Sequence, residues 1–471
     1  MFGNIMSGPF VSVIIPTYGG AGFIGDAIRS VLDQTYSNLE VIVVDDVSPD
    51  HTSEVVAQFN DPRIKYIRHE VNQGAASARG TGRRASSGEI LFFLDQDDLF
   101  HPEKIEAHVD FLKKHPEIGF TYSPYFEQIH SSTGIRTISM PPKEITLTEL
   151  TLSFWLPPSS WVVRREWAFQ PEIWDEYVTL RGREIVVCGR LFLAGCKFAR
   201  IDRVLHYRGY HARRSVRELA KNREDELACQ EIIFSDPRCP DAVKALRPAA
   251  KTTINVMWAD VAFTQRETGL GRLFLRESAK EFPAFFDGNP SPHLQYLMGY
   301  CVDDESYDYE KLLALLFSQL PGEMRNIMQG YFWAVARGSY LRGIRALIWG
   351  RPMDAARHLA KASRYDFRVD EDFVQRVTHE LLGYEMAMGS DAAAVMLEKL
   401  AFEFKDRLSP GEIDWIKASY FFVKGNQWYL AGELGMAGRN VIRVFGLHPP
   451  YIFDRGILSV FLKSIVGMKP R

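Results

Sequence analysis

Short apolar runs alternate with helical stretches from residue 11 to about residue 210 of the chain. The runs are almost continuously apolar, as in Leu-Glu-Val-Ile-Val-Val-Asp at 39–45, and do not alternate with polar residues. Continuous runs are typical of parallel strands covered on both faces, so the pattern predicts a doubly wound α/β domain with a mostly parallel sheet. We expect strands at 11–16, 39–45, 64–68 and 89–94, and helices at 21–34, 52–59 and 75–85.

The second half of the chain has a different pattern. Beyond about residue 216 the strand signal ends, and long helical segments follow, broken near 235–240, 282–292 and 408–410. Small and aliphatic residues with tetratricopeptide-like spacing occur within 336–367: Gly343, Ala346, Gly350, Ala355, Leu359 and Ala362. We find no clean second copy at a fixed period, so an irregular helical repeat and a plain bundle both stay open. We expect an N-terminal extension at 1–10, an α/β domain at 11–225 and an all-α domain at 226–471.

Composition narrows the class of protein. The 471 residues contain 56 Lys and Arg against 59 Asp and Glu, a formal net charge of −3, which does not suit a whole-chain nucleic-acid binder. With 46% hydrophobic and 24% charged residues, the chain can build sizeable cores. The five cysteines form no close Cys-x-x-Cys pair, which favours a reducing cytoplasm.

Membrane-spanning and secretory signals are missing from the sequence. No run of about 18 apolar residues is present, and residues 1–10 lack the features of a signal peptide. The largely apolar stretch at 457–468 is the best candidate for peripheral contact with a membrane, although a terminal core helix is the simpler interpretation. We therefore expect a cytoplasmic protein whose membrane contact, if it has any, is peripheral and at the inner face.

Polar residues follow three of the expected strands, at the edge where open parallel sheets bind ligands. These residues are Pro16, Thr17 and Tyr18 after the first strand, Asp45 and Asp46 after the second, and Asp-Gln-Asp-Asp at 95–98 after the strand at 89–94. Clustered carboxylates repel one another, and a hard cation such as Mg²⁺ or Mn²⁺ would compensate them and also bind diphosphate oxygens. An isolated Asp-x-Asp is usually a solvated loop, but its place behind an apolar strand favours a metal site.

Motifs of several other enzyme classes are missing. The sequence has no Gly-x-x-x-x-Gly-Lys-Ser/Thr, no His-Glu-x-x-His and no Gly-x-Ser-x-Gly. The glycines after the first strand (Gly19, Gly20, Gly22 and Gly25) do not fit Gly-x-Gly-x-x-Gly. A dinucleotide dehydrogenase is therefore disfavoured.

Five motifs in order resemble those of the family 2 glycosyltransferases. They are Val-Ile-Ile-Pro-Thr-Tyr at 13–18, Ser-Val-Leu-Asp-Gln-Thr-Tyr at 30–36, Val-Val-Asp-Asp-Val-Ser-Pro-Asp at 43–50, Asn-Gln-Gly-Ala-Ala-Ser-Ala-Arg at 72–79 and Phe-Leu-Asp-Gln-Asp-Asp at 93–98. The resemblance covers roughly residues 11–211 and implies a GT-A fold, a nucleotide-sugar donor, with a UDP-sugar favoured, and Mn²⁺ or Mg²⁺ as cofactor.

The resemblance also implies roles for the donor-side residues. Pro16, Thr17 and Tyr18 would line the nucleotide pocket, and Asp45 or Asp46 would accept a hydrogen bond from the base. Arg79 would hold the nucleotide. Asp95 and Asp97 would form the Asp-x-Asp element, with Asp97 the more direct metal ligand. The structural alternatives are that Tyr18 only packs and that Arg79 pairs with an acid.

Acceptor-side and catalytic residues follow from the same resemblance. The stretch Leu-Pro-Pro-Ser-Ser-Trp-Val-Val-Arg-Arg at 156–165 resembles the acceptor-side strand, so Ser160 and Trp161, together with Arg190, would lie on that side. Glu184 would be the base that takes the proton of the acceptor hydroxyl. Arg183 replaces the first acid of the usual acidic pair, which leaves a displaced alignment or reduced activity open. A Glu that only favours a helix N-terminus is the structural alternative.

Two basic stretches complete the pattern. Tyr-Arg-Gly-Tyr-His at 207–211 resembles the family's Tyr-Arg-x-His ending with one extra residue, and it implies that His211 approaches the metal. It lies within 200–223, which holds eight Arg or Lys against two acids, and 337–368 holds eight more against Asp354 and Asp366. The second stretch could bind an acceptor, form a dimer or contact an anionic membrane, or it could be a solvated face of packed helices.

Our hypothesis is an inverting, metal-dependent glycosyltransferase that moves a sugar to a hydroxyl acceptor in bacterial surface glycan synthesis. The acceptor would be a glycan, a lipid-linked molecule or a protein, and the helical domain would bind it or form a homodimer. The alternatives are a glycosyltransferase for proteins or peptides, and a weakly active sugar-nucleotide-binding scaffold that acts through its helical domain. Arg183 favours the scaffold, and the donor sugar, linkage and oligomeric state are not set by the sequence.

Overall fold

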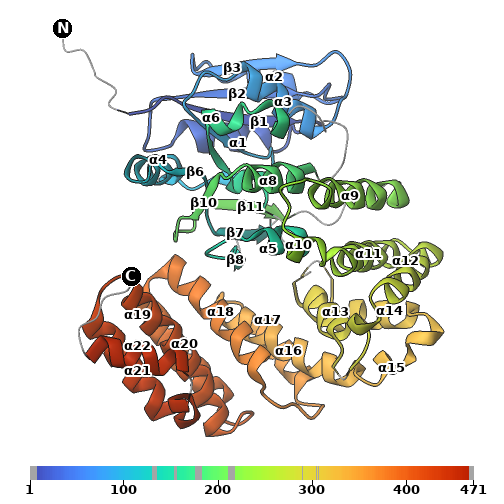
Figure 1. Cartoon of the computed structure of the whole chain (residues 1–471), viewed down its shortest axis with the longest axis vertical. Coiled ribbons are helices and arrows are strands. Elements are labelled where there is room, and N and C mark those ends of the chain that lie inside the picture. Colours follow the sequence, from blue (N-terminus) through green and yellow to red (C-terminus); the bar gives the residue numbers. More distant parts are fainter. Residues whose placement is uncertain are drawn as a thin grey trace. The chain divides into compact units, whose positions relative to one another are not determined.

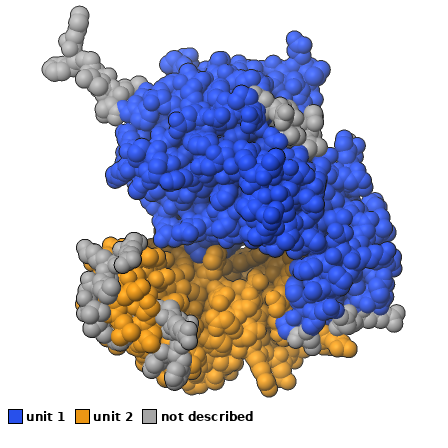
Figure 2. Space-filling view, viewed as in Figure 1, with its two compact units in different colours: residues 1–293, 314–328 blue, residues 294–313, 329–471 orange. Residues whose placement is uncertain are grey.

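The computed structural model describes residues 8–129, 135–152, 156–174, 183–210, 218–288, 290–303, 305, 307–453 and 455–465. It divides into two compact units (Figure 2): unit 1 comprises residues 1–293 and 314–328, and unit 2 comprises residues 294–313 and 329–471. Helices beyond residue 225 belong to both units, so the division between the units does not coincide with the boundary expected at 225/226, and that boundary stays a prediction.

A seven-stranded sheet in the order β10-β6-β9-β4-β1-β2-β3 lies in unit 1 (Figure 1). Its strands are β1 (Val11–Thr17), β2 (Leu39–Asp45), β3 (Ile64–Arg68), β4 (Ile90–Phe93), β6 (Ile118–Tyr122), β9 (Val162–Arg164) and β10 (Lys197–Arg200). β4, β1, β2 and β3 are parallel to one another, β10 is parallel to β6, and β9 runs antiparallel between β4 and β6. The expected mostly parallel α/β sheet is therefore confirmed, with the change in strand order between β1 and β4.

Helices cover both faces of this sheet, and a smaller sheet adjoins its carboxyl-end loops. The unit 1 helices are α1 (Ile24–Leu32), α2 (Thr52–Ala57), α3 (Ala75–Ala85), α4 (Lys104–Lys114), α5 (Leu147–Leu152), η1 (Pro158–Ser160), α6 (Arg165–Ala168), α7 (Pro171–Trp174), α8 (Arg183–Leu193), α9 (Leu219–Phe234), α10 (Asp241–Lys244), α11 (Arg247–Thr264), α12 (Thr268–Glu281), η2 (Pro283–Phe285), η3 (Gly322–Met324) and α15 (Arg325–Met328). The smaller sheet has the order β5-β11-β7-β8, with β5 (Leu99–Phe100), β7 (Tyr125–Ile129), β8 (Ile135–Ser139) and β11 (His206–Tyr210).

The continuous apolar runs are explained by burial on two faces. Val11, Val13 and Ile15 of β1 pack in one core with residues of α1 and α4, whereas Ile14 belongs to the core on the opposite face. All seven residues of β1 are buried, so no position of the strand calls for a solvated polar side chain. On the face that holds Ile14, α3 approaches the sheet so closely that a Cβ atom on Gly82 would lie 2.4 Å from Cγ2 of Ile14.

In the described residues from 218 onward, every regular element is a helix, as expected. The remaining helices are α13 (Pro292–Asp303), α14 (Tyr309–Gln319), α16 (Tyr331–Ile348), α17 (Pro352–Ala362), α18 (Glu371–Met388), α19 (Ser390–Phe404), α20 (Pro410–Leu430), α21 (Leu434–Leu447), η4 (Pro449–Phe453) and α22 (Arg455–Ile465). Figure 1 shows α16 to α22 in orange to red. The part of the chain that the structure describes contains no helix long and apolar enough to cross a membrane.

The helix pairs of unit 2 show a second copy of the small-residue pattern, which the search of the sequence for a fixed period did not find. In α16/α17 a Cβ on Gly343 would meet Leu359, and in α20/α21 a Cβ on Gly425 would meet Val441. Gly350 and Gly432 end the first helix of each pair with φ of +71° and +81°. The positions in the two pairs differ by 425 − 343 = 82, as do 432 − 350 and 441 − 359. The helical part is therefore an irregular helical repeat rather than a plain bundle.

The basic stretch at 337–368 is largely used inside unit 2. Arg337 is buried and pairs with Asp370 and Asp372, at 2.6 and 2.7 Å. Arg342 is also buried, and it donates to carbonyl oxygens at the end of α13 and in the loop that follows. The other internal pairs are Arg345 with Glu380, Arg351 with Glu305 and Lys361 with Asp308. Most of this charge therefore holds helices together and is not presented to an anionic partner.

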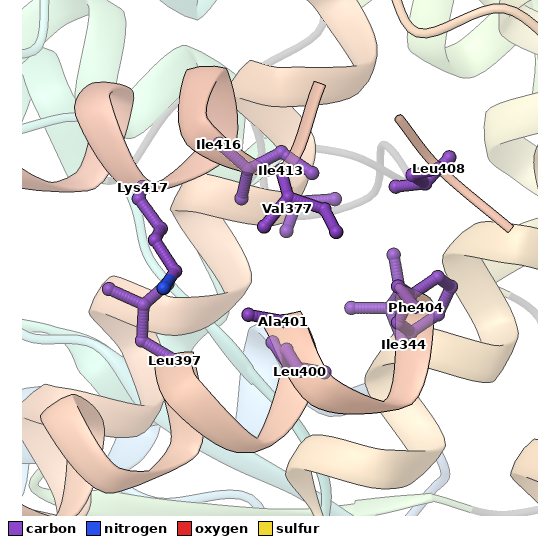
Figure 3. Close-up of a pocket in the computed structure, with 10 residues that line it drawn as sticks. All are labelled: Ile344, Val377, Leu397, Leu400, Ala401, Phe404, Leu408, Ile413, Ile416 and Lys417. Carbon is purple, nitrogen blue, oxygen red and sulfur yellow. The ribbon is translucent and has the colours of Figure 1, made fainter. Parts of the chain in front are cut away.

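A small cavity lies between neighbouring repeats of unit 2. Its volume is about 20 Å³, and apolar side chains from α16, α18, α19 and α20 converge on it (Figure 3). Lys417 lies beside it and pairs with Glu398 at 2.8 Å. The space holds about one methyl or water-sized group, so we interpret it as imperfect packing between repeats.

We expect Gly82→Ala to destabilise unit 1 by about 1–3 kcal/mol, because the added methyl group overlaps Ile14 in a packed core. Gly80→Ala on the same helix is the matched control. Its Cβ would meet only the end of the Arg84 side chain at 3.4 Å, so improved helix propensity should leave stability equal or up to about 1 kcal/mol higher. Urea unfolding of both variants measures the difference, and equal midpoints would contradict the packing argument.

We expect Val377→Ile to stabilise unit 2 by up to about 0.8 kcal/mol, because the added methylene group fills the cavity in Figure 3. Val374→Ile is the control, since Val374 lies on the same helix, is fully buried and does not line the cavity. It should destabilise through overpacking. Thermal unfolding followed by circular dichroism distinguishes the two, and a lower midpoint for Val377→Ile would refute the cavity assignment.

Candidate active site

A pocket of about 430 Å³ opens at the carboxyl ends of β4, β1 and β2. Its lining residues are Pro16, Thr17, Tyr18, Asp46, Asn72, Gly74, Ala75, Arg79, Asp95, Gln96 and Asp97. Three loops that are far apart in the chain meet here because β4, β1 and β2 are neighbours in the sheet. Every donor-side residue predicted from the sequence lines this pocket, with the exception of Asp45. The volume falls in the range of small-molecule sites.

Asp45 and Asp46 are adjacent in sequence but point to different partners. Asp45 is fully buried below the pocket, where it accepts from Ser48 N, the Tyr66 hydroxyl and Arg68. Burial, together with the bond to Asp45, raises the pKa of Tyr66 to about 12. Asp46 reaches the pocket. It accepts from the backbone N–H groups of Gln73 and Gly74 at 2.8 and 2.6 Å and contacts the ring of His69 at 2.8 Å.

A strained turn follows the two acids. Val47 has a φ of +66°, in the left-handed region that β-branched residues rarely adopt. Such strain persists only where the surroundings hold it. Here Asp45 binds the N–H of Ser48 on the far side of the turn. Asp45 therefore anchors the turn that follows β2.

Arg79 joins two acids that are 89 positions apart (184 − 95). Its Nη2 atom lies 2.6 Å from Asp95 Oδ1, and its Nη1 atom lies 3.0 Å from Glu184 Oε1. Burial disfavours the guanidinium charge, but Asp95 and Glu184 outweigh that effect and raise the pKa of Arg79. Glu184, in the first turn of α8, is thereby brought beside the pocket, although it is not among the lining residues. The side chain of Arg183 lies outside the described set.

The third acid of the Asp-Gln-Asp-Asp run turns inward. Asp98 is buried, accepts from Ser159 Oγ at 2.5 Å and from Gly209 N at 2.9 Å, and so ties this loop to η1 and β11. Burial, with the charges of Asp95 and Asp97, raises the pKa of Asp98 to about 8. Ser159 Oγ in turn accepts from the Asp95 N–H at 3.0 Å. Asp98 and Ser159 therefore support the carboxylates that face the pocket.

Gln96 and Ser159 take part in the site but were not predicted from the sequence. Its side-chain amide bonds to Thr17 and to the backbone of Tyr18 across the pocket edge. The only sequence signal for Gln96 is its position inside the Asp-x-Asp element. Ser159 carries no signal of its own, since its partner Asp98 lies 61 positions away.

The residues predicted for the acceptor side are not brought to the pocket lining. Ser160 is buried and donates to Pro157 O, while Trp161 packs in the core and donates to Leu156 O. Arg190 donates to the carbonyl of Glu172, away from the pocket-lining set. Their acceptor contacts stay a prediction, and the burial of Ser160 and Trp161 supports a structural role for both. His211, predicted as a metal ligand, lies outside the described residues.

The carboxylates at the pocket suit a hard divalent cation. Asp95 and Asp97 both line it, and among the described contacts of Asp95 only Oδ1 is engaged, by Arg79. The described residues contain no group of three or more His, Cys, Asp or Glu side chains that could hold a metal ion. A cation at Asp95 and Asp97 would therefore complete its coordination with water or ligand oxygens, as Mg²⁺ commonly does.

Fold and pocket together define an α/β protein whose pocket lies at the topological switch point of a mostly parallel sheet, where such folds bind ligands. Residues 12–169 match the family described as Glycosyl transferase family 2. This region of the chain is therefore a family 2 glycosyltransferase domain, and the resemblance seen in the sequence is confirmed.

Curated relatives match just under a third of the chain. A relative from Escherichia coli named UDP-Glc:alpha-D-GlcNAc-diphosphoundecaprenol beta-1,3-glucosyltransferase WfgD is 39% identical over 140 residues, 30% of this chain and 54% of its own length. The putative teichuronic acid biosynthesis glycosyltransferase TuaG of Bacillus subtilis is 34% identical over 140 residues, 29% of this chain and 55% of its own length. The chain spans about half the length of these relatives.

Solved structures show a weaker overall likeness. S. aureus TarS residues 1–349 in complex with UDP has 16% sequence identity and a TM-score of 0.42, covering 77% of this chain and 94% of that chain. The mannosyltransferase PcManGT from Pyrobaculum calidifontis in complex with GDP-Man and Mn²⁺ has 18% identity and a TM-score of 0.41, covering 68% and 88%. Likeness at this level carries no inference about activity.

We expect Asp46→Asn to loosen residues 72–74 and to destabilise unit 1 by about 1–3 kcal/mol, because the NH₂ group that replaces one carboxylate oxygen cannot accept the backbone N–H group that this oxygen accepts. Hydrogen exchange of a peptide that covers 70–79 should become faster. The control is Asp26→Asn, which removes an exposed pair with Arg29 and should change stability by less than about 1 kcal/mol. Unchanged exchange in this peptide would refute the anchoring role of Asp46.

Proposed function

We propose that this chain is an inverting, metal-dependent glycosyltransferase that moves a sugar from a nucleotide-sugar donor to a hydroxyl acceptor. The observation that carries the proposal is the pocket in the family 2 domain, where Asp95, Asp97 and Arg79 meet and Glu184 lies 3.0 Å from Arg79. The pocket thus combines carboxylates for a cation, a guanidinium for phosphate and a carboxylate that can act as a base.

Asp95 and Asp97 would hold Mn²⁺ or Mg²⁺, since their oxygens are the hard ligands that these ions prefer. When bound, the cation supplies Lewis-acid stabilisation of the diphosphate leaving group. Arg79 keeps Asp95 oriented through its 2.6 Å contact, and Ser159 fixes the Asp95 backbone. The chain thereby presents one side of the cation site before a donor arrives.

Glu184 is the proposed general base. Arg79 holds its Oε1 atom, and no described contact engages Oε2, so Oε2 can accept the proton of an acceptor hydroxyl. That hydroxyl oxygen then attacks the anomeric carbon as the bond to the nucleoside diphosphate breaks on the opposite face. A single displacement of this kind inverts the configuration at the anomeric carbon.

Thr17 and Tyr18 form the donor-side wall, and Asp46 lies at the wall that would face the base. Asp46 already accepts two backbone N–H groups, so a base would meet the remaining lone pairs of its oxygens or the neighbouring Asn72. We favour a UDP-sugar as donor, since the name of the E. coli relative specifies UDP-Glc.

For the acceptor we propose a lipid-linked glycan intermediate of a bacterial surface polymer. The names of two relatives support this class: that of the E. coli relative contains a diphosphoundecaprenol-linked sugar, and that of the B. subtilis relative contains teichuronic acid. Such an acceptor would be reached from the cytoplasmic side by peripheral contact with the inner face of the membrane. The helical repeats would contribute acceptor contacts or a homodimer surface, through residues other than the internally paired arginines.

We expect the full chain, with Mn²⁺ and a panel of UDP-, GDP- and dTDP-sugars, to release nucleoside diphosphate in the presence of a lipid-linked or glycan acceptor. Glu184→Gln should lower kcat by about 10²–10⁴-fold, because it removes the base. Asp97→Asn should lower activity by at least about 100-fold, because it removes a metal ligand. EDTA should abolish turnover, and added Mn²⁺ or Mg²⁺ should restore it.

The matched control is Glu166→Gln, an exposed carboxylate of the same domain that lies outside the pocket lining and should retain wild-type turnover. Turnover unaffected by Glu184→Gln would refute the assignment of the base. Nucleotide-sugar binding without turnover on any acceptor would favour the scaffold hypothesis. Transfer only to a peptide or protein acceptor would contradict the lipid-linked class.

A further inference from the structure

Gln96 connects the two halves of the donor pocket. It stands between Asp95 and Asp97 in sequence, but its side chain turns across the pocket edge to the loop after β1. Gln96 Oε1 accepts from Thr17 Oγ1 at 2.6 Å and from the Tyr18 N–H at 2.9 Å. Gln96 Nε2 donates to the Tyr18 carbonyl at 3.3 Å. One amide thus makes three hydrogen bonds to two consecutive pocket residues.

The chemistry of this contact requires a carboxamide. The backbone of Tyr18 offers one donor and one acceptor, and a primary amide matches both. A carboxylate at position 96 would place an oxygen against the Tyr18 carbonyl and add negative charge beside Asp95, Asp97 and Asp98. An aliphatic side chain of equal length would fill the space and make no hydrogen bond.

The rest of the loop is anchored from a different side. Gly19, Gly20 and Ala21 donate their N–H groups to Ser48, Thr52 and Asp50, at 3.0, 3.0 and 3.1 Å. Gln96 therefore supplies the described hydrogen bonds to the backbone of Tyr18 from the β4 side. The fit is close, because a Cβ atom on Gly20 would lie 2.4 Å from Gln96 Oε1.

The position of the Tyr18 side chain depends on this restraint of its backbone. Its side chain lines the pocket and is 49% exposed, so little packing holds it in place. A pocket residue that becomes ordered only when the ligand binds costs conformational entropy and weakens binding, whereas a residue that is already ordered does not.

We propose that Gln96 is a positioning residue that sets the affinity for the nucleotide-sugar donor by holding Tyr18 at the pocket wall before the donor binds. This inference rests on the proposed function. Gln96 does not touch the reacting atoms in this role. Its removal should therefore change the KM for donor and leave the chemical step largely intact.

The test compares Gln96→Met, Gln96→Glu and Thr17→Val in the full chain with Mn²⁺. Gln96→Met keeps the side-chain length and loses all three bonds, so the donor KM should rise about 5- to 50-fold with kcat within about threefold. Thr17→Val removes one bond of the three and should raise the KM by about 2- to 5-fold. Gln96→Glu should raise the KM more than Gln96→Met does, because its carboxylate faces the Tyr18 carbonyl and the diphosphate.

Calorimetric titration with UDP and Mn²⁺, or with the nucleoside diphosphate of whichever donor is turned over, provides a readout without catalysis. Its Kd should rise in parallel with the KM. Gln58→Met, an exposed glutamine after α2 that does not line the pocket, is the control and should match the wild type.

The outcomes separate this inference from the proposed function. A wild-type chain that neither binds nor turns over any nucleotide sugar refutes the proposed function itself. An active wild type with an unchanged KM in Gln96→Met, or with a loss confined to kcat, overturns the role of Gln96 alone. If Gln96→Met does not fold, as judged by circular dichroism, an unchanged KM in Thr17→Val overturns it instead.

Discussion

The crowding of carboxylates at the carboxyl ends of β4, β1 and β2 is the constraint on which the rest of unit 1 depends. A parallel sheet places these ends side by side, and each acid there needs its own compensation. Asp45 is paired with Arg68 and Tyr66, Asp46 binds backbone N–H groups, and Arg79 lies between Asp95 and Glu184. Burial and the charges of Asp95 and Asp97 raise the pKa of Asp98, and hydrogen bonds from Ser159 and Gly209 offset part of that effect.

Much of the sheet could be predicted from the sequence, because burial on both faces leaves a strong local signal. The bounds expected for β2, β3 and α3 match the structure, and α3 starts just after Gly74, whose φ is +87°. The expected helix at 21–34 is shorter, Ile24–Leu32, because the N–H groups of Phe23 and Ile24 both bond to the carbonyl of Gly20 and form a turn first. The direction in which a side chain points leaves no comparable signal in the sequence. Nothing local shows that Ser159 rather than Ser160 meets Asp98, or that Trp161 belongs to the core.

The helical repeats could not be recognised in the sequence for a related reason. Close crossing of two helices needs a small residue at the contact, as at Gly343 and Gly425, but the intervening pair α18/α19 carries its glycines at a different spacing. There Gly383 and Gly389 are six positions apart, against seven between Gly343 and Gly350. The contact in α16/α17 recurs in α20/α21, but the pair between them does not keep the spacing, so a search for a fixed period fails. The roles of the arginines of α16 could not be predicted for the same reason. Their acidic and carbonyl partners lie on other segments of the chain that only the fold brings close.

The charges at the pocket also support a cation requirement. Among the described residues that line it or contact Arg79, four carboxylates, those of Asp46, Asp95, Asp97 and Glu184, stand against one guanidinium. A diphosphate would add negative charge and compete with Asp95 and Glu184 for Arg79, so donor binding by this chain alone would separate the guanidinium from the acids that it orients. Positive charge from a divalent ion at Asp95 and Asp97 offsets that competition and lets Arg79 keep Glu184 in place. Gln96 fits the same logic, because a neutral amide restrains Tyr18 without adding another carboxylate to the pocket edge.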